Sequence, residues 1–218
     1  DGSFCGSAEA CKSGRAYGRI PGTIDLDIAC TDYTIGFDTA VNTAMEAIDK
    51  IRDTSTSMSG AVSSRLWDAT RDTLRSGAVS LNGAERILMP EENDYNEEEL
   101  IKDILLNKKT RKEELIIINA EGIGDSLNMA KRIEEATGME TRATILGHMQ
   151  RGGSPTCKDR VYASTMGAMA VELLCDGKTN RVIGYRDGKF IDYDINKALS
   201  MKKEISAYQY EIAKTLAL

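Results

Sequence analysis

The sequence predicts an α/β protein in which mainly parallel strands are flanked by helices. Short apolar runs, typical of buried strands, alternate with longer segments whose apolar residues recur at helical spacing. Polar or glycine-rich loops follow several of the apolar runs, and open α/β sheets bind ligands where strands end in such loops. The 218 residues, 41% of them apolar, suffice for one large domain or two small ones.

Helical periodicity and end signals locate the predicted helices. The apolar face of Thr39–Arg52 indicates an amphipathic helix, and an acidic first turn, which the helix dipole favours, marks the segment that begins at Glu97. Gly138 is a typical residue to end a helix. The predicted helices are Thr39–Arg52, Glu97–Leu106, Asp125–Thr137, Arg160–Leu174 and those that close the chain within Ile195–Leu218.

The predicted strands are short apolar runs bounded by residues that interrupt regular structure. Leu115–Asn119 (LIIIN) is the most apolar run and is expected in the core of a parallel sheet. Pro90 ends the run that begins at Arg86, because proline cannot donate to a strand ladder. The predicted strands are Arg86–Pro90, Leu115–Asn119 and Thr141–Gly147, followed by a hairpin of Arg181–Gly184 and Phe190–Asp192.

Composition and charge exclude several classes of partner. The net charge of −6 argues against nucleic acid and anionic membranes, because both attract basic surfaces. No apolar run reaches the roughly 18 residues of a membrane span, and no secretory signal is recognisable. The five cysteines form no Cys-x-x-Cys pair, which predicts reduced thiols in a cytoplasmic protein. His148 is the sole histidine, so a histidine-ligated metal site is not expected.

The stretch PGTIDLD places polar side chains directly after a turn. Gly22 lets a ligand approach the backbone, Thr23 offers a hydroxyl, and Asp25 and Asp27 are expected on one side of an extended stretch. One carboxylate could take a hydroxyl proton while another holds Mg²⁺ beside phosphates. The spacing leaves open, on equal terms, a proline-glycine turn whose aspartates cap the next helix.

Two later loops carry candidate binding residues. In GHMQRGGSP, the Arg151 guanidinium suits phosphate oxygens, and the glycines let backbone N–H groups face an anion. In NAEGIGD, Glu121 follows the most apolar strand, where it could hydrogen-bond sugar hydroxyls. The residues alone leave open the alternatives of His148 as a hydrogen-bonded surface group and Glu121 as a solvated strand end.

Four stretches resemble bacterial 6-phosphofructokinases in a single order: DGS, PGTIDLDIACTDYTIGFDTA, NAEGIGDS and ETRATILGHMQRGGSP. The resemblance covers the whole chain and corresponds to roughly the last two-thirds of that enzyme, so the N-terminal part of the nucleotide domain is expected to be missing. It implies a phosphofructokinase-like α/β fold in three parts. These are the rest of the nucleotide-binding domain with the catalytic loop (1–36), a smaller sugar-phosphate-binding domain (37–149) and a segment that returns to the nucleotide-binding domain (150–218).

The resemblance implies transfer of the γ-phosphate of MgATP to the 1-hydroxyl of fructose 6-phosphate, a reaction of cytoplasmic glycolysis. Asp25 would be the base, and Thr23 would contact the transferring phosphate. The other implied roles are Mg²⁺ at Asp1 and Asp27, ATP phosphates at Gly2 and Ser3, fructose 6-phosphate at Glu121, Arg142, His148 and Arg151, and an ADP effector at Arg52, Gly83 and Glu85. Gly2 and Gly22 are typical of the ATP-using branch rather than the pyrophosphate-using one.

The family also implies a homotetramer, in which Arg142 would reach into the site of a neighbouring subunit. One segment departs from the family's pattern. Where the family has a Val-Val-Glu-Val-Met-Gly-Arg strand and loop that binds the sugar phosphate, this chain has SSRLWDA from Ser63 to Ala69. Synonymous codons for Ser63–Ala78, shifted by one base, restore the family's sequence, and a similar shift does so for Ala8–Tyr17. This pattern indicates paired frameshifts.

The departure predicts that the chain is a partial and inactive copy of the enzyme. Each unpaired polar group in a buried central strand would cost about 1–3 kcal/mol. Two other readings remain open at this point. One is a non-catalytic sugar-phosphate or nucleotide-binding relative, and the other is a kinase that acts on a different phosphosugar.

Overall fold

The computed structural model describes residues 17–55, 61–65, 86–88, 96–109, 115–119 and 123–202. The chain divides into two compact units, each discontinuous in sequence. Unit 1 comprises Asp1–Ala40 and Ser154–Ser206, and unit 2 comprises Val41–Gly153 and Ala207–Leu218. Both units contain strands and helices, which confirms the predicted α/β class. None of the described helices combines the length and the apolar character that a membrane crossing requires.

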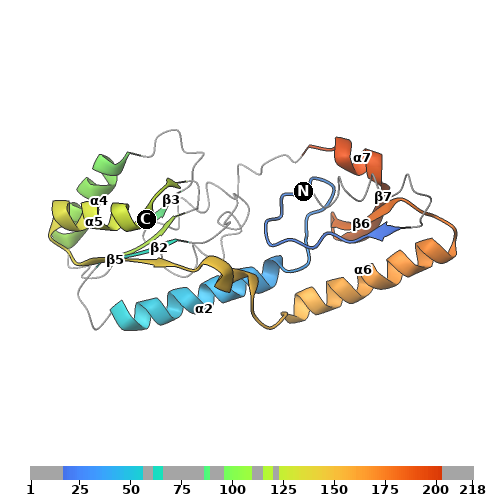
Figure 1. The fold of residues 1–218 in the computed structure, drawn as a ribbon, viewed down its shortest axis with the longest axis horizontal. Helices are drawn as coiled ribbons and strands as arrows, with labels where there is room; N and C mark the ends of the chain where they lie inside the picture. The colour runs from blue at the N-terminus through green and yellow to red at the C-terminus, as the bar shows by residue number, and fades with distance from the viewer. Residues whose placement is uncertain are drawn as a thin grey trace. The chain divides into compact units, whose positions relative to one another are not determined.

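Unit 2 contains a four-stranded parallel sheet in the order β3-β4-β2-β5 (Figure 1). Its strands are β2 (Ala61–Arg65), β3 (Arg86–Leu88), β4 (Leu115–Asn119) and β5 (Thr141–Ile145). Strand β4 has the predicted bounds and is buried along its whole length, as expected of a parallel strand covered on both faces. The parallel sheet predicted from the sequence is therefore present in this unit.

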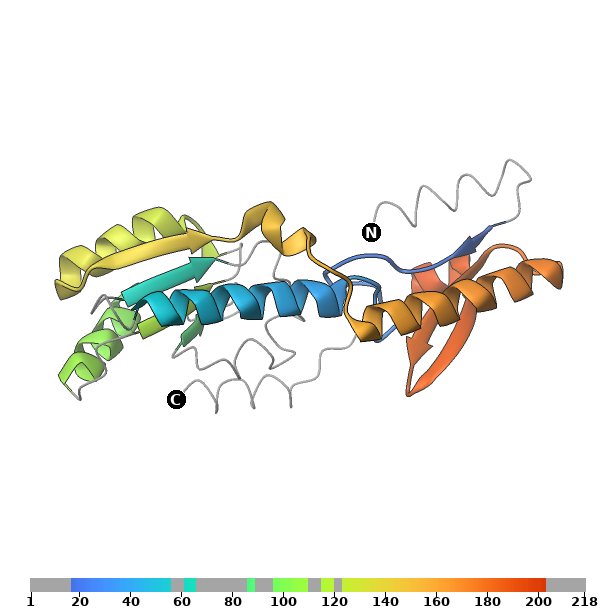
Figure 2. The same ribbon diagram turned by 90° about the horizontal axis from the view of Figure 1, so that it is seen from below.

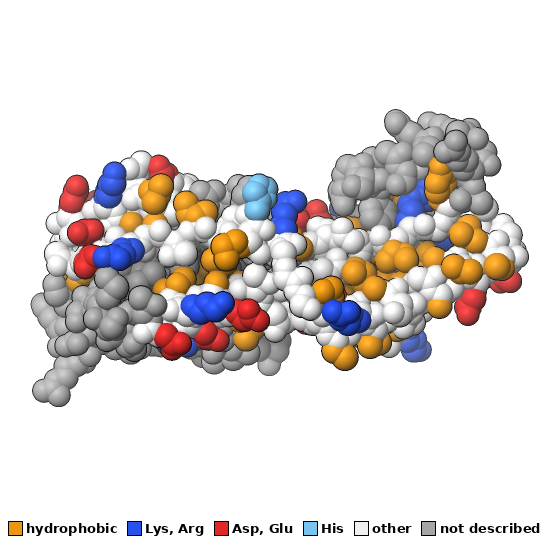
Figure 3. Space-filling view, turned by 60° about the horizontal axis from the view of Figure 1, so that its bottom comes forward, with side chains coloured by type: hydrophobic (Ala, Val, Ile, Leu, Met, Phe, Trp, Pro, Cys, Tyr) orange, Lys and Arg blue, Asp and Glu red, His pale blue; other side chains and the backbone are white. Residues whose placement is uncertain are grey.

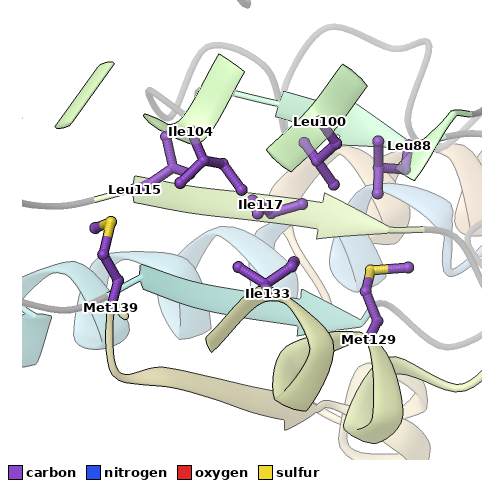
Figure 4. Packing of buried hydrophobic residues seen from close by; sticks show 8 residues of the cluster. All are labelled: Leu88, Leu100, Ile104, Leu115, Ile117, Met129, Ile133 and Met139. Atoms are coloured by element: carbon purple, nitrogen blue, oxygen red, sulfur yellow. The ribbon is translucent and has the colours of Figure 1, made fainter. Parts of the chain in front are cut away.

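Two helices cover one face of the unit 2 sheet. Helices α4 (Glu97–Lys109) and α5 (Ser126–Thr137) contribute side chains that meet those of β3 and β4 (Figure 4). The buried cluster consists of Leu88, Leu100, Ile104, Leu115, Ile117, Met129, Ile133 and Met139. Ile116 and Ile118 are also buried, and strand alternation places them on the opposite face, behind which α2 (Phe37–Ser55) lies in Figure 4.

Local signals explain the ends of α5. The Asp125 side chain accepts hydrogen bonds from the Leu127 and Asn128 backbone N–H groups at 3.0 and 3.3 Å, so it caps the helix. Gly138 follows the last turn with a φ of 64°, a left-handed conformation that glycine adopts without a Cβ penalty. Both ends agree with the sequence to within one residue.

Strand β2, whose sequence is partly polar, is an inner strand of the unit 2 sheet. It pairs in parallel register with β4 and β5, and Ser64 is aligned with Ile118 on one side and with Thr144 on the other. Backbone groups alone make the ladder, so polar residues do not prevent the pairing. The rest of the segment whose sequence departs from the family, from Leu66 onward, lies outside the described residues.

Unit 1 contains a three-stranded sheet in the order β1-β6-β7. Strand β1 (Gly18–Arg19) is parallel to β6 (Arg181–Arg186), which forms an antiparallel hairpin with β7 (Lys189–Asp194). Asp187 and Gly188 connect the hairpin with φ values of 51° and 78°, as a type I′ turn requires. The predicted hairpin is confirmed, with longer strands, whereas the two-residue β1 was not predicted.

Side chains of β6 alternate between two small cores. Ile183 packs with Met166, Ala170 and Leu173 of α6 (Cys157–Cys175), whereas Val182 faces a second cluster. That second cluster contains Ile28 and Cys30 from the loop before α2 and Ile195 and Ala198 from α7 (Ile195–Ser200). Helix α7 is the first of the helices predicted within Ile195–Leu218, and it ends at Ser200. Residues from 203 onward lie outside the described part.

Candidate functional site

The stretch Pro21–Gly36 forms a closed loop in unit 1 and carries the candidate catalytic residues. It follows β1 and ends where α2 begins. The Ile35 backbone N–H donates to the Pro21 carbonyl oxygen at 2.9 Å, which joins the two ends of the loop. Thr23, Asp25 and Asp27 lie near its start.

The later half of this loop is fixed to β6 through Thr31. The buried Thr31 hydroxyl accepts from the Tyr185 N–H at 3.0 Å and donates to the Tyr33 carbonyl oxygen at 2.8 Å. Gly184 makes room for this contact, because a Cβ there would lie 3.1 Å from the Thr31 Cβ. The loop is therefore held against the sheet by a hydroxyl that needs glycine opposite it.

Thr23 and Asp25 form a local turn. The Thr23 hydroxyl donates to Oδ2 of Asp25 at 3.1 Å, and the Asp25 backbone N–H donates back to the Thr23 hydroxyl oxygen at 3.3 Å. Asp25 is half-buried and Asp27 is exposed. The half-buried carboxylate is thus oriented by the neighbouring hydroxyl, an arrangement suited to proton transfer with a bound hydroxyl group.

The expectation that Asp25 and Asp27 share one side of an extended stretch is wrong. Leu26, between them, has a φ of 51°, which is left-handed, so the i, i+2 alternation of an extended chain does not apply. Asn180 and Asp187 are the other described non-glycine residues with positive φ, and both belong to types that tolerate it. A leucine in this conformation stores local strain between the two carboxylates.

The strain at Leu26 predicts an unusual order of stability for two truncations. Leu26→Ala and Leu26→Gly remove the same apolar side chain, but only alanine keeps the Cβ that opposes a positive φ. We expect the glycine variant to be more stable than the alanine variant by about 1 kcal/mol, whereas glycine is normally less stable than alanine. Urea unfolding of the two variants measures this difference. An alanine variant as stable as the glycine variant would show that Leu26 is not strained.

A buried carboxylate from α6 holds the end of the loop. Oδ1 of Asp159 accepts from the Tyr33 hydroxyl at 2.6 Å and from the Gly36 N–H at 2.8 Å. Oδ2 accepts from the Thr39 N–H at 3.0 Å and from the Thr39 hydroxyl. Asp159 is 2% exposed. The acceptor at the start of α2 is thus supplied by a residue far along the chain, and not by the helix-capping aspartates of PGTIDLD that the sequence left open.

The N-terminal ends of α2 and α6 lie side by side (Figures 1 and 2). Each first turn accepts hydrogen bonds from the other. Thr156, which caps α6 by accepting from the Asp159 N–H at 3.3 Å, donates its own hydroxyl to Asp38 of α2 at 2.6 Å. The Thr156 N–H donates to the Thr39 hydroxyl oxygen at 3.2 Å. Two acidic side chains therefore lie where two helix N-termini meet, and their charge offsets the repulsion between the positive ends.

Asp159 and its donors Tyr33, Gly36 and Thr39 form a hydrogen-bonded group, the Asp159 clamp. The clamp shifts the pKa values of Tyr33 and Asp159 in opposite directions. Burial, followed by the hydrogen bond to Asp159, raises the pKa of the Tyr33 hydroxyl well above its ordinary value. Burial opposes ionisation of Asp159, but the hydrogen bonds from Thr39, Tyr33 and the Gly36 N–H outweigh it and lower the pKa of the carboxyl. The carboxylate stays ionised and the phenol stays protonated at neutral pH.

Sequence reasoning missed the Asp159 clamp. A signal was available in Thr156 and Asp159, which have the spacing of a capping box at a helix start. That pattern predicts the N-terminus of α6, which the structure places at Cys157 rather than at Arg160. It does not predict that the Asp159 carboxylate accepts hydrogen bonds from backbone N–H groups at the start of α2.

The candidate sugar-phosphate residues lie in unit 2. His148 and Arg151 are exposed on the short helix η3 (Gly147–Arg151), and Figure 3 shows the histidine at the surface. Arg142 on β5 is exposed and donates to Glu140 Oε1 at 2.6 and 2.9 Å. Each of the three can present a cationic or hydrogen-bonding group to a solvent-borne anion.

Among the remaining predicted site residues, the structure describes Arg52 but not the other six. Arg52 lies in the last turn of α2, 3.9 Å from the Asp49 carboxylate. Six predicted site residues lie outside the described part of the chain: Asp1, Gly2, Ser3, Gly83, Glu85 and Glu121. The structure thus brings together Thr23 and Asp25, and it places Arg142, His148 and Arg151 in the same unit.

Of the two predicted magnesium ligands, Asp1 and Asp27, only Asp27 lies in the described part of the chain. Its exposed carboxylate is the hard oxygen donor that Mg²⁺ prefers, and Mg²⁺ commonly takes one or two carboxylates together with phosphate oxygens. The described residues contain no group of three or more acidic, cysteine or histidine side chains placed to hold a metal ion by themselves. Asp27 therefore fits a metal that is bound jointly with a phosphate ligand.

Known proteins resemble this chain over most of its length. A family model described as Phosphofructokinase matches residues 1–174. An ATP-dependent 6-phosphofructokinase of Clostridium botulinum strain Hall is 47% identical over 217 residues, which is 100% of this chain and 68% of the relative. ATP-dependent 6-phosphofructokinase 1 of Clostridium perfringens strain 13 is 48% identical over 99% of this chain and 67% of its own length.

Solved structures share the fold. Phosphofructokinase of Pichia pastoris in the T-state has a TM-score of 0.71 and 27% identity, over 91% of this chain and 23% of its own. A pyrophosphate-dependent phosphofructokinase from Marinobacter aquaeolei has a TM-score of 0.74 and 18% identity, over 97% of this chain and 63% of its own. The chain spans only a part of each of these proteins.

Proposed function

Because this chain belongs to the phosphofructokinase family, we propose that it carries the phosphoryl-transfer loop and the sugar-phosphate residues of an ATP-dependent 6-phosphofructokinase. The reaction is transfer of the γ-phosphate of ATP to the 1-hydroxyl of fructose 6-phosphate, giving fructose 1,6-bisphosphate. The observation that carries the proposal is the 47% identity, over the whole chain, to a relative named for this activity. The local geometry at Thr23 and Asp25 supports it.

Asp25 acts as the base in the proposed mechanism. Its half-buried carboxylate takes the proton of the sugar 1-hydroxyl as that oxygen attacks phosphorus in line with the leaving ADP oxygen. The Thr23 hydroxyl orients the carboxylate and contacts the transferring phosphate. Asp27 and Asp1 would hold Mg²⁺, which would supply neutralisation of the phosphate charge.

Unit 2 supplies the sugar-phosphate residues in this proposal. The exposed His148 and Arg151 of η3 bind the phosphate and hydroxyl groups of fructose 6-phosphate, together with Glu121. Arg142 completes a site across a subunit interface in a cytoplasmic homotetramer. Arg52, Gly83 and Glu85 form the ADP effector site, and Gly2 and Ser3 contact the ATP phosphates.

The experiment uses three forms of the protein. One is the chain alone. The second is the chain joined to the part of the Clostridium botulinum relative that it does not cover. The third, the restored protein, is the second form with Ser63–Ala78 replaced by VVEVMGRNAGYIALWS and Ala8–Tyr17 replaced by RKLAKAGVRT, as the frameshift hypothesis requires. We expect the restored protein to make fructose 1,6-bisphosphate from fructose 6-phosphate with MgATP and not with pyrophosphate, and the chain alone to make none.

Two outcomes separate the proposal from its alternative. Activity in the restored protein together with inactivity in the second form would locate the defect in the two altered segments. Fructose 6-phosphate binding by calorimetry in all three forms, without turnover in any, would instead indicate a non-catalytic sugar-phosphate-binding relative. Turnover of another phosphosugar would indicate a kinase of different specificity.

A further inference from the structure

We propose that Asp159 is a positioning residue for the catalytic loop, holding the end of Pro21–Gly36 so that Thr23 and Asp25 keep their orientation. The inference rests on the proposed function, in which those two residues carry the chemistry. Asp159 does not touch the reacting atoms in this proposal. It acts through the backbone of the loop.

The Asp159 carboxylate is an acceptor surrounded by donors. Each oxygen receives one backbone N–H, from Gly36 on Oδ1 and from Thr39 on Oδ2, and each receives one hydroxyl, from Tyr33 and Thr39 respectively. A hydroxyl can rotate to accept a hydrogen bond, but a backbone N–H cannot. Asparagine in either amide orientation would therefore turn an NH₂ group toward a backbone N–H, so the clamp requires the charged acid.

Neighbouring residues and one backbone hydrogen bond connect the clamp to the stretch that carries Asp25. Gly36, whose N–H the clamp holds, has a φ of 105°, and a Cβ built on it would lie 3.7 Å from Cγ2 of Ile24. Ile24 stands between Thr23 and Asp25. The next contact is at Ile35, whose N–H closes the loop on Pro21 at 2.9 Å. Release of Gly36 would therefore loosen the loop closure at the adjacent Ile35 and free the backbone that lies next to Ile24.

The clamp is rigid because both of its supports are helix ends. Asp159 lies in the first turn of α6, and its partner Thr39 lies in the first turn of α2. Thr156 and Asp38 tie the same two turns in the reverse direction. The ring of Tyr33 also packs edge-to-face against Tyr162 of α6, with ring centroids 4.6 Å apart. The end of the loop is thus held in place by two helices, α2 and α6.

The test measures backbone hydrogen exchange of the full chain by mass spectrometry. Three variants are compared with the parent chain: Asp159→Asn, Tyr33→Phe and Ile183→Val. The last is a control for a general loss of packing in unit 1, because Ile183 is buried against α6 and its apolar side chain makes none of the clamp's hydrogen bonds. We expect exchange of peptides covering residues 21–36 to rise by about tenfold or more in Asp159→Asn, by less in Tyr33→Phe, and little in Ile183→Val.

Kinetics of the restored protein add a readout that a purely structural role would not move. We expect Tyr33→Phe, and Asp159→Asn where it folds, to lower kcat while leaving KM for fructose 6-phosphate nearly unchanged, because the sugar-phosphate residues belong to unit 2. If neither variant changes exchange in residues 21–36 beyond the Ile183→Val control, the positioning role is refuted. Faster exchange in a protein that transfers no phosphate would refute the proposed function and leave the clamp standing.

Discussion

Asp25→Asn is expected to lower kcat of the restored protein by about 10²–10⁴-fold, the usual contribution of a general base. Asparagine has nearly the same shape as aspartate, and its amide oxygen can still accept the Thr23 hydroxyl, so the loop geometry is preserved. What is lost is the ability to take the proton of the attacking hydroxyl. Steady-state kinetics with fructose 6-phosphate and MgATP measure the effect.

Asp32 provides a matched control for Asp25. It belongs to the same loop and is exposed, and its carboxylate accepts a surface hydrogen bond from the Asp187 N–H at 3.0 Å. Asp32→Asn removes the same charge from the same loop, and we expect kcat to stay within a factor of about three, since exposed charges act weakly through solvent. A kcat for Asp25→Asn above one-tenth of the parent value would contradict its role as the base.

Asp159→Asn is expected to lower the free energy of unfolding of the chain by about 2–4 kcal/mol. The substitution removes charge-assisted hydrogen bonds and sets an amide NH₂ against a half-buried backbone N–H, and each such loss costs about 1–3 kcal/mol. Urea unfolding at neutral pH measures the loss, with Asp176→Asn as a control, because Asp176 is an exposed acid just after α6. A loss below about 1 kcal/mol would show that the clamp contributes little to stability.

The stabilisation by Asp159 should depend on pH. Because its pKa is lowered in the folded chain, the folded state binds this proton more weakly than the unfolded state does. The contribution is fully present above the ordinary value of 3.8 and is lost as pH falls through the lowered pKa. The difference in unfolding free energy between the parent chain and Asp159→Asn should therefore be constant near neutral pH and shrink below the ordinary value. A constant difference throughout would contradict the assignment.

Features set by neighbouring residues were predictable from the sequence. The helix between Asp125 and Gly138 has its cap residues next to the segment they cap. In the hairpin, Asp187 and Gly188 are residue types that adopt the positive φ values of a tight turn. The apolar run of β4 likewise identified a strand covered on both faces. In each case the cause lies within a few residues of its effect, so the pattern carries the information.

Features set by distant contacts were not predictable. The partners of Asp159 lie about 120 residues earlier in the chain, so no local spacing reveals them. Leu26 takes a positive φ that leucine normally avoids, and this made the prediction for Asp25 and Asp27 wrong. Strand β1 has only two residues and exists because β6 pairs with it. Tertiary contacts decide all three.

The polar strand β2 joins the sequence hypothesis to the fold. The structure pairs Ala61–Arg65 with strands on both sides, in the position of an inner strand of a parallel sheet. Such positions normally hold Val, Ile or Leu. The frameshift hypothesis supplies Val-Val-Glu-Val in place of Ser63–Leu66, which fits an inner strand better than the residues present. It stays a prediction that the source DNA can decide.

The most direct test of the central claim is ³¹P NMR of fructose 6-phosphate and MgATP incubated with the restored protein and with its Asp25→Asn variant. The proposed mechanism predicts a second sugar phosphate, at the 1-position, that grows as ATP becomes ADP with Asp25 in place and stays near background with asparagine. Equal product formation by the two proteins would contradict the role of Asp25. Absence of product from the restored protein, with fructose 6-phosphate still bound, would contradict the proposed enzymatic function.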